Sequence, residues 1–194
     1  MKTEILYIHG FASSDNSLKA LKLENYFLQF SFFNVIHPQI PVSPYKAIDF
    51  LDEIYKNNPL LMVIGSSLGG FYALYMHKKY SLETFLINPS LKPHETLKDY
   101  IGIVKRHNSD DFFQWKQTHI KELEDLYSKL NYDKLNQKKL HFLLSEDDEL
   151  LDFSDIDKIF PLADIRFFKD SGHSFKKFDK VLPYLMSYYL SLIS

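Results

Sequence analysis

The pentapeptide Gly65-Ser66-Ser67-Leu68-Gly69 constrains the fold more than any other feature, because of the segments on either side of it. The apolar run 60–64 directly before it is typical of a buried strand, and residues 70–76 after it carry apolar side chains at helical spacing. A Gly-x-Ser-x-Gly sequence in this context is typical of a nucleophile elbow, a tight turn that holds the serine hydroxyl out at the edge of a sheet. A side chain at either flanking position would collide with the strand or the helix, so we expect both positions to require glycine.

Length and composition favour a single globular domain spanning residues 1–194, with 45% hydrophobic and 25% charged residues. The formal net charge of -2 provides no basic surface for nucleic acid or for an anionic membrane. The absence of cysteine excludes disulfides, thiol catalysis and thiolate metal sites. The N-terminus has no signal-peptide core, and no apolar stretch approaches the ~18 residues of a membrane span. We therefore expect a cytoplasmic protein.

Short apolar runs with strand character recur along the chain and are separated by helical patterns. Most of the runs are continuous rather than alternating, as expected for strands covered on both faces of a parallel sheet. Strands that alternate with helices predict an α/β fold with right-handed crossovers. We predict about six mostly parallel strands flanked by helices, with the strands at 5–8, 34–37, 60–64, 84–87, 140–144 and 164–168.

The segment between Pro89 and Lys139 interrupts this alternation, because it is much longer than one crossover needs. A structureless loop of this length is uncommon in a compact domain, so residues 90–139 predict a helical insertion over the strand ends. Several apolar residues there share one helical face: Ile120, Leu123, Leu126, Tyr127 and Leu130. Two interpretations remain open at this point, a lid over the site and plain packing.

A serine hydroxyl becomes a good nucleophile when a base takes its proton, and that base works best when a carboxylate orients it. After a nucleophile elbow the expected chain order is serine, acid, histidine. His173 is the histidine that lies past the last predicted strand, in a loop containing glycine, and we predict that it is the base. The run 146–149 follows the strand at 140–144, in the loop where the acid belongs. Asp148 is the first choice, Asp147 the second and Asp152, beyond the run, a distant third; spacing does not separate the neighbours, and the choice depends on the family resemblance given below.

The tetrahedral intermediate of acyl transfer needs two backbone N–H donors aimed at its negative oxygen. Leu68, the residue after the nucleophile, is expected to supply one. The loop after the first strand is expected to supply the other through Phe11, with Gly10 making room for the backbone. We interpret His9 as a structural residue that holds this loop, and a second base is the less favoured alternative.

Other chemistry has little support in the sequence. His94, His107 and His119 fall in the insertion at spacings that match no zinc signature. Gly69-Gly70 lacks the rest of a dinucleotide fingerprint, so we expect no metal and no cofactor.

The segments that carry these residues closely resemble the small bacterial YqiA-type esterases of the α/β-hydrolase superfamily. The resemblance runs in order along nearly the whole chain and rests on five stretches: 6–20, 65–73, Ile87-Asn88-Pro89 with Pro93, 148–153 and His173-Ser174-Phe175. It implies a minimal α/β-hydrolase fold, with Ser67 as nucleophile, Asp148 as acid and His173 as base. It also implies hydrolysis of carboxylic esters or acyl thioesters without a cofactor.

Two positions depart from the family pattern. Asp147 stands where the family commonly has glycine before the acid, and Gly172 stands where it commonly has an acidic residue before the histidine.

These features together predict a serine hydrolase that cleaves a small-molecule ester through an acyl-enzyme. The alternatives are an acyl-thioesterase or acyltransferase with the same triad, and a catalytically silent scaffold that keeps the elbow only for folding. The surviving serine, acid, base and oxyanion loop argue against the silent scaffold.

Overall fold

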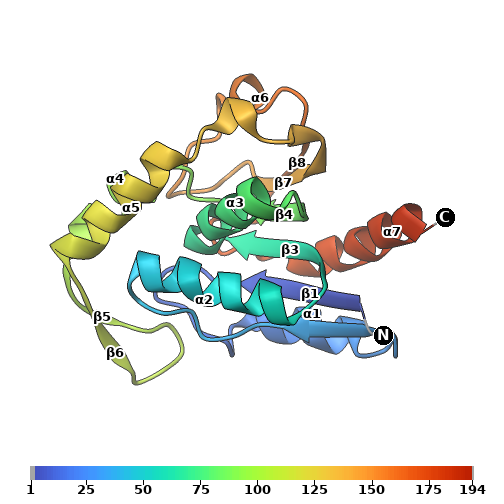
Figure 1. Cartoon of the computed structure of the whole chain (residues 1–194), viewed down its shortest axis with the longest axis horizontal. Helices are drawn as coiled ribbons and strands as arrows, with labels where there is room; N and C mark the ends of the chain where they lie inside the picture. Colours follow the sequence, from blue (N-terminus) through green and yellow to red (C-terminus); the bar gives the residue numbers. More distant parts are fainter. Residues whose placement is uncertain (1–2, 194) are drawn as a thin grey trace.

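A computed structural model describes residues 3–193 and contains a six-stranded sheet in which every pairing is parallel (Figure 1). The strand order is β2-β1-β3-β4-β7-β8. The strands are β1 Thr3–Ile8, β2 Phe33–Ile36, β3 Leu60–Ser66, β4 Glu83–Ile87, β7 Leu140–Ser145 and β8 Asp164–Phe168. Each predicted apolar run overlaps one of these strands, so the predicted α/β architecture is confirmed.

Helices cover both faces of the sheet and bury two apolar cores. On one face lie α2 Pro44–Asn57, α3 Leu68–Tyr80, α5 Gln117–Lys129 and the short α6 Ile156–Ile159. On the other face lie α1 Leu18–Phe27 and α7 Val181–Ile193. Since both faces of the sheet are covered, its strands carry continuous apolar runs rather than alternating ones.

Helix α1 was not predicted from the sequence, because apolar side chains lie on both of its faces. Leu23 and Phe27 are buried against the sheet, whereas Leu18 and Leu21 are exposed. The exposed leucines blur the helical periodicity that sequence analysis depends on. The start of the helix is nevertheless marked by Ser17, whose side chain accepts a hydrogen bond from the N–H of Ala20.

The expected insertion is only partly helical. It contains α5, the short helix α4 Pro93–Thr96, and an antiparallel hairpin of β5 Gly102–Lys105 and β6 Phe112–Trp115. Figure 1 shows this hairpin extending from the end of the molecule where α2 and α5 lie. Along β6 the aromatic Trp115 is buried while Phe112 is exposed, and such one-sided burial suits a strand.

Helix α5 is tied to the start of α2 by one carboxylate. Glu122 accepts hydrogen bonds from the hydroxyl of Ser43, 2.7 Å away, and from the N–H of Tyr45, 3.2 Å away. Ser43 is the N-cap of α2, so this carboxylate also lies at the positive end of that helix, where negative charge is stabilising. The helical part of the insertion is therefore fastened to the body of the domain.

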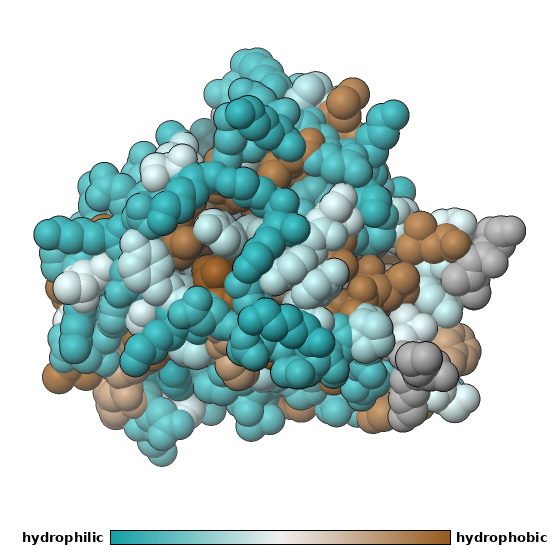
Figure 2. Space-filling model, viewed as in Figure 1, coloured by the Kyte–Doolittle hydropathy of each residue, from teal (hydrophilic) through white to brown (hydrophobic). Residues whose placement is uncertain are grey.

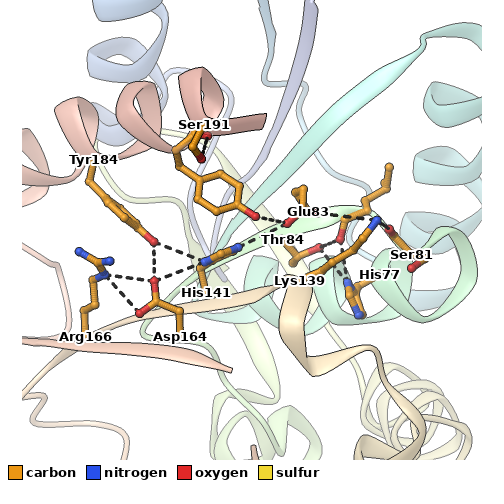
Figure 3. Close-up of polar contacts among 12 residues, drawn as sticks. His77, Ser81, Glu83, Thr84, Lys139, His141, Asp164, Arg166, Tyr184 and Ser191 are labelled. Carbon is orange, nitrogen blue, oxygen red and sulfur yellow. Dashed lines mark hydrogen bonds and ion pairs between the residues drawn. The ribbon is translucent and has the colours of Figure 1, made fainter. Parts of the chain in front are cut away.

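A polar network fastens α7 to the sheet (Figure 3). His141 at the start of β7 lies between Glu83 of β4 and Asp164 of β8, at 3.4 and 3.5 Å. From α7, Tyr184 donates a hydrogen bond to Asp164 and Tyr188 donates one to Glu83, each at 2.6 Å. Glu83, His141 and Asp164 lie at the amino-terminal ends of their strands, opposite the end of the sheet where β3 meets the predicted elbow. The network therefore stabilises the fold at a distance from the predicted site.

The face drawn in Figure 2 is largely hydrophilic, with apolar side chains gathered toward α7. Leu190 and Leu192 of that helix are among the exposed apolar residues. Across residues 3–193 the helices include none with the combined length and apolar character that crossing a membrane requires.

Candidate active site

Ser67 occupies the tight turn between β3 and α3 with the strained backbone of a nucleophile elbow. Its φ of 54° and ψ of -120° lie in a region that disfavours residues with a side chain. A Cβ at Gly69 would overlap the carbonyl oxygen of Ile8, and a Cβ at Gly65 would overlap the backbone of Gly69. Glycine is therefore required on both sides of the turn, as the sequence predicted. The neighbouring Ser66 is buried at the end of β3.

The structure brings three of the predicted residues together in one hydrogen-bonded chain. Nε2 of His173 lies 3.1 Å from the hydroxyl oxygen of Ser67. Nδ1 of the same ring lies 2.9 and 3.1 Å from the two carboxylate oxygens of Asp148. Because a carboxylate only accepts hydrogen bonds, Nδ1 carries the proton, and Nε2 is free to accept the proton of the serine. This is the relative arrangement of nucleophile, base and acid in a Ser-His-Asp triad.

The Asp148 carboxylate is buried and held by the backbone of its own loop. Its side chain is 1% exposed. The N–H groups of Leu150 and Leu151 each donate a 2.9 Å hydrogen bond to Oδ1. These donors compensate the carboxylate for the water it has lost and fix the direction in which it faces His173.

The neighbouring carboxylates hold the loops of the site and do not contact the histidine ring. Asp147 accepts hydrogen bonds from the hydroxyl of Ser145 at 2.7 Å and from the N–H of Ser171 at 2.9 Å. These two bonds lower the pKa of Asp147 to about 2. Glu149 accepts a 2.9 Å hydrogen bond from the backbone N–H of His173, which lowers the pKa of this glutamate. The third candidate, Asp152, accepts hydrogen bonds from the N–H and the hydroxyl of Ser154 within its own turn.

Leu68 and the loop that carries Phe11, the predicted sources of the oxyanion donors, lie next to Ser67. Leu68 is the first residue of α3, and N–H groups in the first turn of a helix have no partner within it. The loop that carries Phe11 lies close to Ser67: a Cβ at Gly10 would be 3.1 Å from the Cβ of Ser67. A pocket lined by both Phe11 and Leu68 opens at this point.

His9 holds the Phe11 loop in place. Its Nε2 accepts a 3.1 Å hydrogen bond from the N–H of Ile40, so Nδ1 carries the proton and donates to the carbonyl of Gly10 at 2.9 Å. Burial is the main cause of the lowered pKa of His9, which keeps the ring neutral. The ring therefore holds the loop through one hydrogen bond at each nitrogen.

Asn88 is a site residue to which sequence reasoning assigned no role. It follows β4, is fully buried and has a φ of 41°. Its amide nitrogen donates to the carbonyls of Gly172 and His173 at 3.1 and 3.2 Å. Its amide oxygen accepts a 2.8 Å hydrogen bond from the N–H of Ser145. One side chain thereby joins the loop of Asp148 to the loop of His173. The available sequence signal was the position of Asn88 directly after a predicted strand, in the stretch Ile87-Asn88-Pro89 that carries the family resemblance.

The insertion histidines show no metal-binding arrangement. The described part of the chain contains no group of three or more His, Cys, Asp or Glu residues placed to hold a metal ion. Nδ1 of His119 instead accepts a 3.2 Å hydrogen bond from the N–H of Lys116 at the start of α5.

A sequence model described as an uncharacterised protein family, UPF0227, matches residues 4–189. This chain belongs to UPF0227. A UPF0227 protein of Shewanella sp. (strain MR-7) is 24% identical over 126 residues, which span 59% of this chain and 69% of that protein. The resemblance to YqiA-type proteins is confirmed at the level of the family.

Solved structures similar to this UPF0227 protein have the α/β-hydrolase fold. Est1E from Butyrivibrio proteoclasticus superposes with a TM-score of 0.70 at 11% identity, covering 99% of this chain and 88% of Est1E. The mouse alpha/beta hydrolase domain-containing protein 10 gives a TM-score of 0.69 at 16% identity, with coverages of 98% and 90%. MGS-MChE2, an alpha/beta hydrolase from a sediment metagenome of the Mar Chica lagoon, Morocco, gives 0.66 at 16% identity, with coverages of 100% and 93%. At these identities the likeness establishes the fold alone.

Proposed function

We propose that this UPF0227 protein hydrolyses carboxylic esters through a Ser67-His173-Asp148 triad and an acyl-enzyme intermediate. The observation that carries the proposal is the continuous hydrogen-bonded chain from the Ser67 hydroxyl through both ring nitrogens of His173 to a buried Asp148. The fold is shared with solved structures that include lipolytic enzymes and an esterase domain, which is consistent with the proposal.

In the proposed reaction the Ser67 oxygen attacks the ester carbonyl carbon while Nε2 of His173 takes the hydroxyl proton. The N–H groups of Phe11 and Leu68 stabilise the resulting oxyanion. The intermediate collapses when His173 returns the proton to the leaving alcohol, which yields an acyl-enzyme. Water then attacks the acyl carbonyl with the same histidine as base, releasing the acid and regenerating the serine. Asp148 holds the ring in the required tautomer throughout.

Hydrolysis of p-nitrophenyl esters from acetate to palmitate tests the proposal. We expect Ser67→Ala to remain folded and to lower kcat by roughly 10⁴–10⁶, as in other triads, and His173→Ala to have a similar effect. The matched control is Ser66→Ala, which removes the adjacent buried hydroxyl and is expected to retain activity within about tenfold of wild type. Ester turnover within tenfold of wild type in Ser67→Ala would refute the assignment.

Acyl-CoA substrates and added acceptor alcohols form a second arm of the assay. Thioester cleavage with no ester cleavage would replace the proposal with an acyl-thioesterase, and transfer to the alcohol would replace it with an acyltransferase. Absence of turnover in every arm would favour the silent scaffold.

A further inference from the structure

A narrow slot opens beside the Ser67 loop, lined among others by Phe11, Leu68, Phe113, Trp115 and Arg106. We call it the Arg106 slot. Its volume is ≈ 30 Å³. A slot of this size accommodates a small group more readily than a long acyl chain.

Aromatic rings give the slot rigid walls. The ring of Phe11 packs edge-to-face on Trp115 and Phe113, with centroids 5.0 and 5.6 Å apart. Trp115 is fixed in turn, because its indole N–H donates a 3.1 Å hydrogen bond to the carbonyl of Leu97. Apolar walls of this kind lower the local dielectric and strengthen any charge interaction inside.

Arg106 is held at the slot with most of its hydrogen-bonding capacity unused. Its guanidinium lies 4.9 Å from the centroid of the Phe113 ring, and Nη1 donates a 2.7 Å hydrogen bond to the carbonyl of Ser13. Within residues 3–193 no carboxylate forms an ion pair with it, and the nearby Asp110 pairs with Lys105 instead. A guanidinium has five N–H donors and prefers planar anions such as carboxylates and phosphates.

Among the residues that line the slot, only Arg106 carries a positive charge at neutral pH. His9, the other lining side chain that titrates near neutral pH, has its pKa lowered first by burial and also by the charge of Arg106. It is therefore neutral, and Arg106 alone among the lining residues attracts an anion.

A second hollow, next to Asp148, has the opposite charge. This hollow of about 850 Å³ is lined by Glu146, Glu149, Asp152 and Asp157 and by no lysine or arginine. An anionic group is repelled from this hollow and attracted to Arg106, so the Arg106 slot is the more favourable place for an anion.

We infer that Arg106 is a specificity-determining residue that binds an anionic group, a carboxylate or a phosphate, on the substrate of this site. The inference rests on the proposed ester hydrolysis. The anion is carried either by the acyl chain or by the alcohol, and the chemistry at Arg106 is the same in both cases.

The first arm of the test places the anion on the acyl chain. The p-nitrophenyl monoesters of succinate, glutarate and adipate are compared with the butyrate, valerate and hexanoate esters of equal carbon number. Spontaneous hydrolysis is subtracted with Ser67→Ala. The second arm places the anion on the alcohol, by comparing the butyrate ester of 3-hydroxybenzoate with phenyl butyrate. The readout is the ratio of kcat/KM for the anionic ester to kcat/KM for its neutral partner.

We expect Arg106→Gln to lower this ratio by about tenfold to a hundredfold in one arm, the range for loss of one hydrogen bond between charged groups. Arg106→Lys keeps the charge without the planar fork and is expected to give an intermediate ratio. The matched control is Lys105→Gln, which removes the same charge from the neighbouring position of the hairpin and should leave the ratio at the wild-type value. Added salt should reduce the wild-type ratio, because Arg106 is only half buried.

If Arg106→Gln lowers kcat/KM equally for anionic and neutral esters, the inference is overturned. Arg106 would then have only the structural role of holding the hairpin to Ser13. That outcome leaves ester hydrolysis intact, so the two proposals fail separately. If no ester is turned over, calorimetric binding of glutarate and valerate is compared in wild type and Arg106→Gln. Glutarate binding that is lost in the variant supports the anion site, and absence of glutarate binding to wild type refutes it.

Discussion

Two adjacent carboxylates, Asp148 and Asp147, have different environments, so neutralising each of them should affect kcat differently. Asp148 contacts Nδ1 of His173, whereas Asp147 contacts Ser145 and Ser171. We expect Asp148→Asn to lower kcat by about 10⁴, because an amide stabilises the wrong histidine tautomer. Asp147→Asn should lower kcat by less than about tenfold. Steady-state kinetics on one ester decide between them, and the reverse order would transfer the role of the acid to Asp147.

We expect Asp147→Asn to lower the stability of the fold by an amount that depends on pH. The pKa of Asp147 is lowered from its ordinary value of 3.8 to about 2. A lowered pKa in the folded state contributes stability that is present at neutral pH and is lost as the pH falls through about 4 toward 2. The difference in Tm between wild type and this variant should therefore be larger at pH 7 than at pH 3.

Backbone strain at Ser67 gives a test of the elbow that does not depend on activity. Both Ser67→Ala and Ser67→Gly remove the nucleophile, but only glycine adopts a φ of 54° with a ψ of -120° without strain. We expect the glycine variant to be more stable than the alanine variant by roughly 1 kcal/mol, after the greater unfolded-state entropy of glycine is included. Urea unfolding of the two variants measures the difference. An alanine variant as stable as the glycine variant would contradict the strained turn.

Strand β4 contributes to the site through the residue that follows it. Asn88 holds the carbonyls of Gly172 and His173 and the N–H of Ser145. Asn88→Gly keeps the backbone freedom that the φ of 41° requires but removes these three bonds. Since small displacements of catalytic groups cost up to about 10²-fold, we expect kcat to fall by about that factor with KM little changed.

A substitution at the opposite end of β4 separates positioning from general destabilisation. Thr84→Val removes a buried hydroxyl that donates a 3.0 Å hydrogen bond to the carbonyl of Leu82. We expect it to lower stability by about 1 kcal/mol and to leave kcat close to that of wild type. If Thr84→Val lowers kcat as much as Asn88→Gly does, Asn88 has no specific positioning role.

The whole domain should unfold as one unit even though residues 90–139 include the hairpin of β5 and β6. Trp115, the one tryptophan of the chain, is 1% exposed in β6 and belongs to the same apolar core as residues of β3, α3 and β7. Unfolding followed by tryptophan fluorescence and by far-UV circular dichroism should therefore give coincident transitions. A fluorescence transition at lower urea concentration would mean that the hairpin opens separately and would support a lid.

Features that depend on neighbouring residues were predictable from the sequence. The apolar runs identified every strand of the main sheet, and the glycines at 65 and 69 identified the elbow, because a tight turn imposes its steric requirements on adjacent positions. The order of strands along the chain predicted that the loops carrying Ser67, Asp148 and His173 would meet at one edge of the sheet. Helix α1 and the hairpin of β5 and β6 were missed, since exposed apolar residues such as Leu18 and Ile103 obscure their periodicity.

Features that depend on contacts between distant loops were decided by the tertiary structure. Ser67 and His173 lie 106 positions apart, and spacing along the chain could not show which of two adjacent aspartates would face the ring. The parallel sheet brings the ends of β3, β4 and β7 together, so Asn88 bridges two loops and Asp147 is turned toward Ser171. The hairpin likewise carries Arg106 to the Ser13 loop. Local sterics are determined by adjacent residues, whereas the direction of a side chain across a site depends on how the whole sheet is assembled.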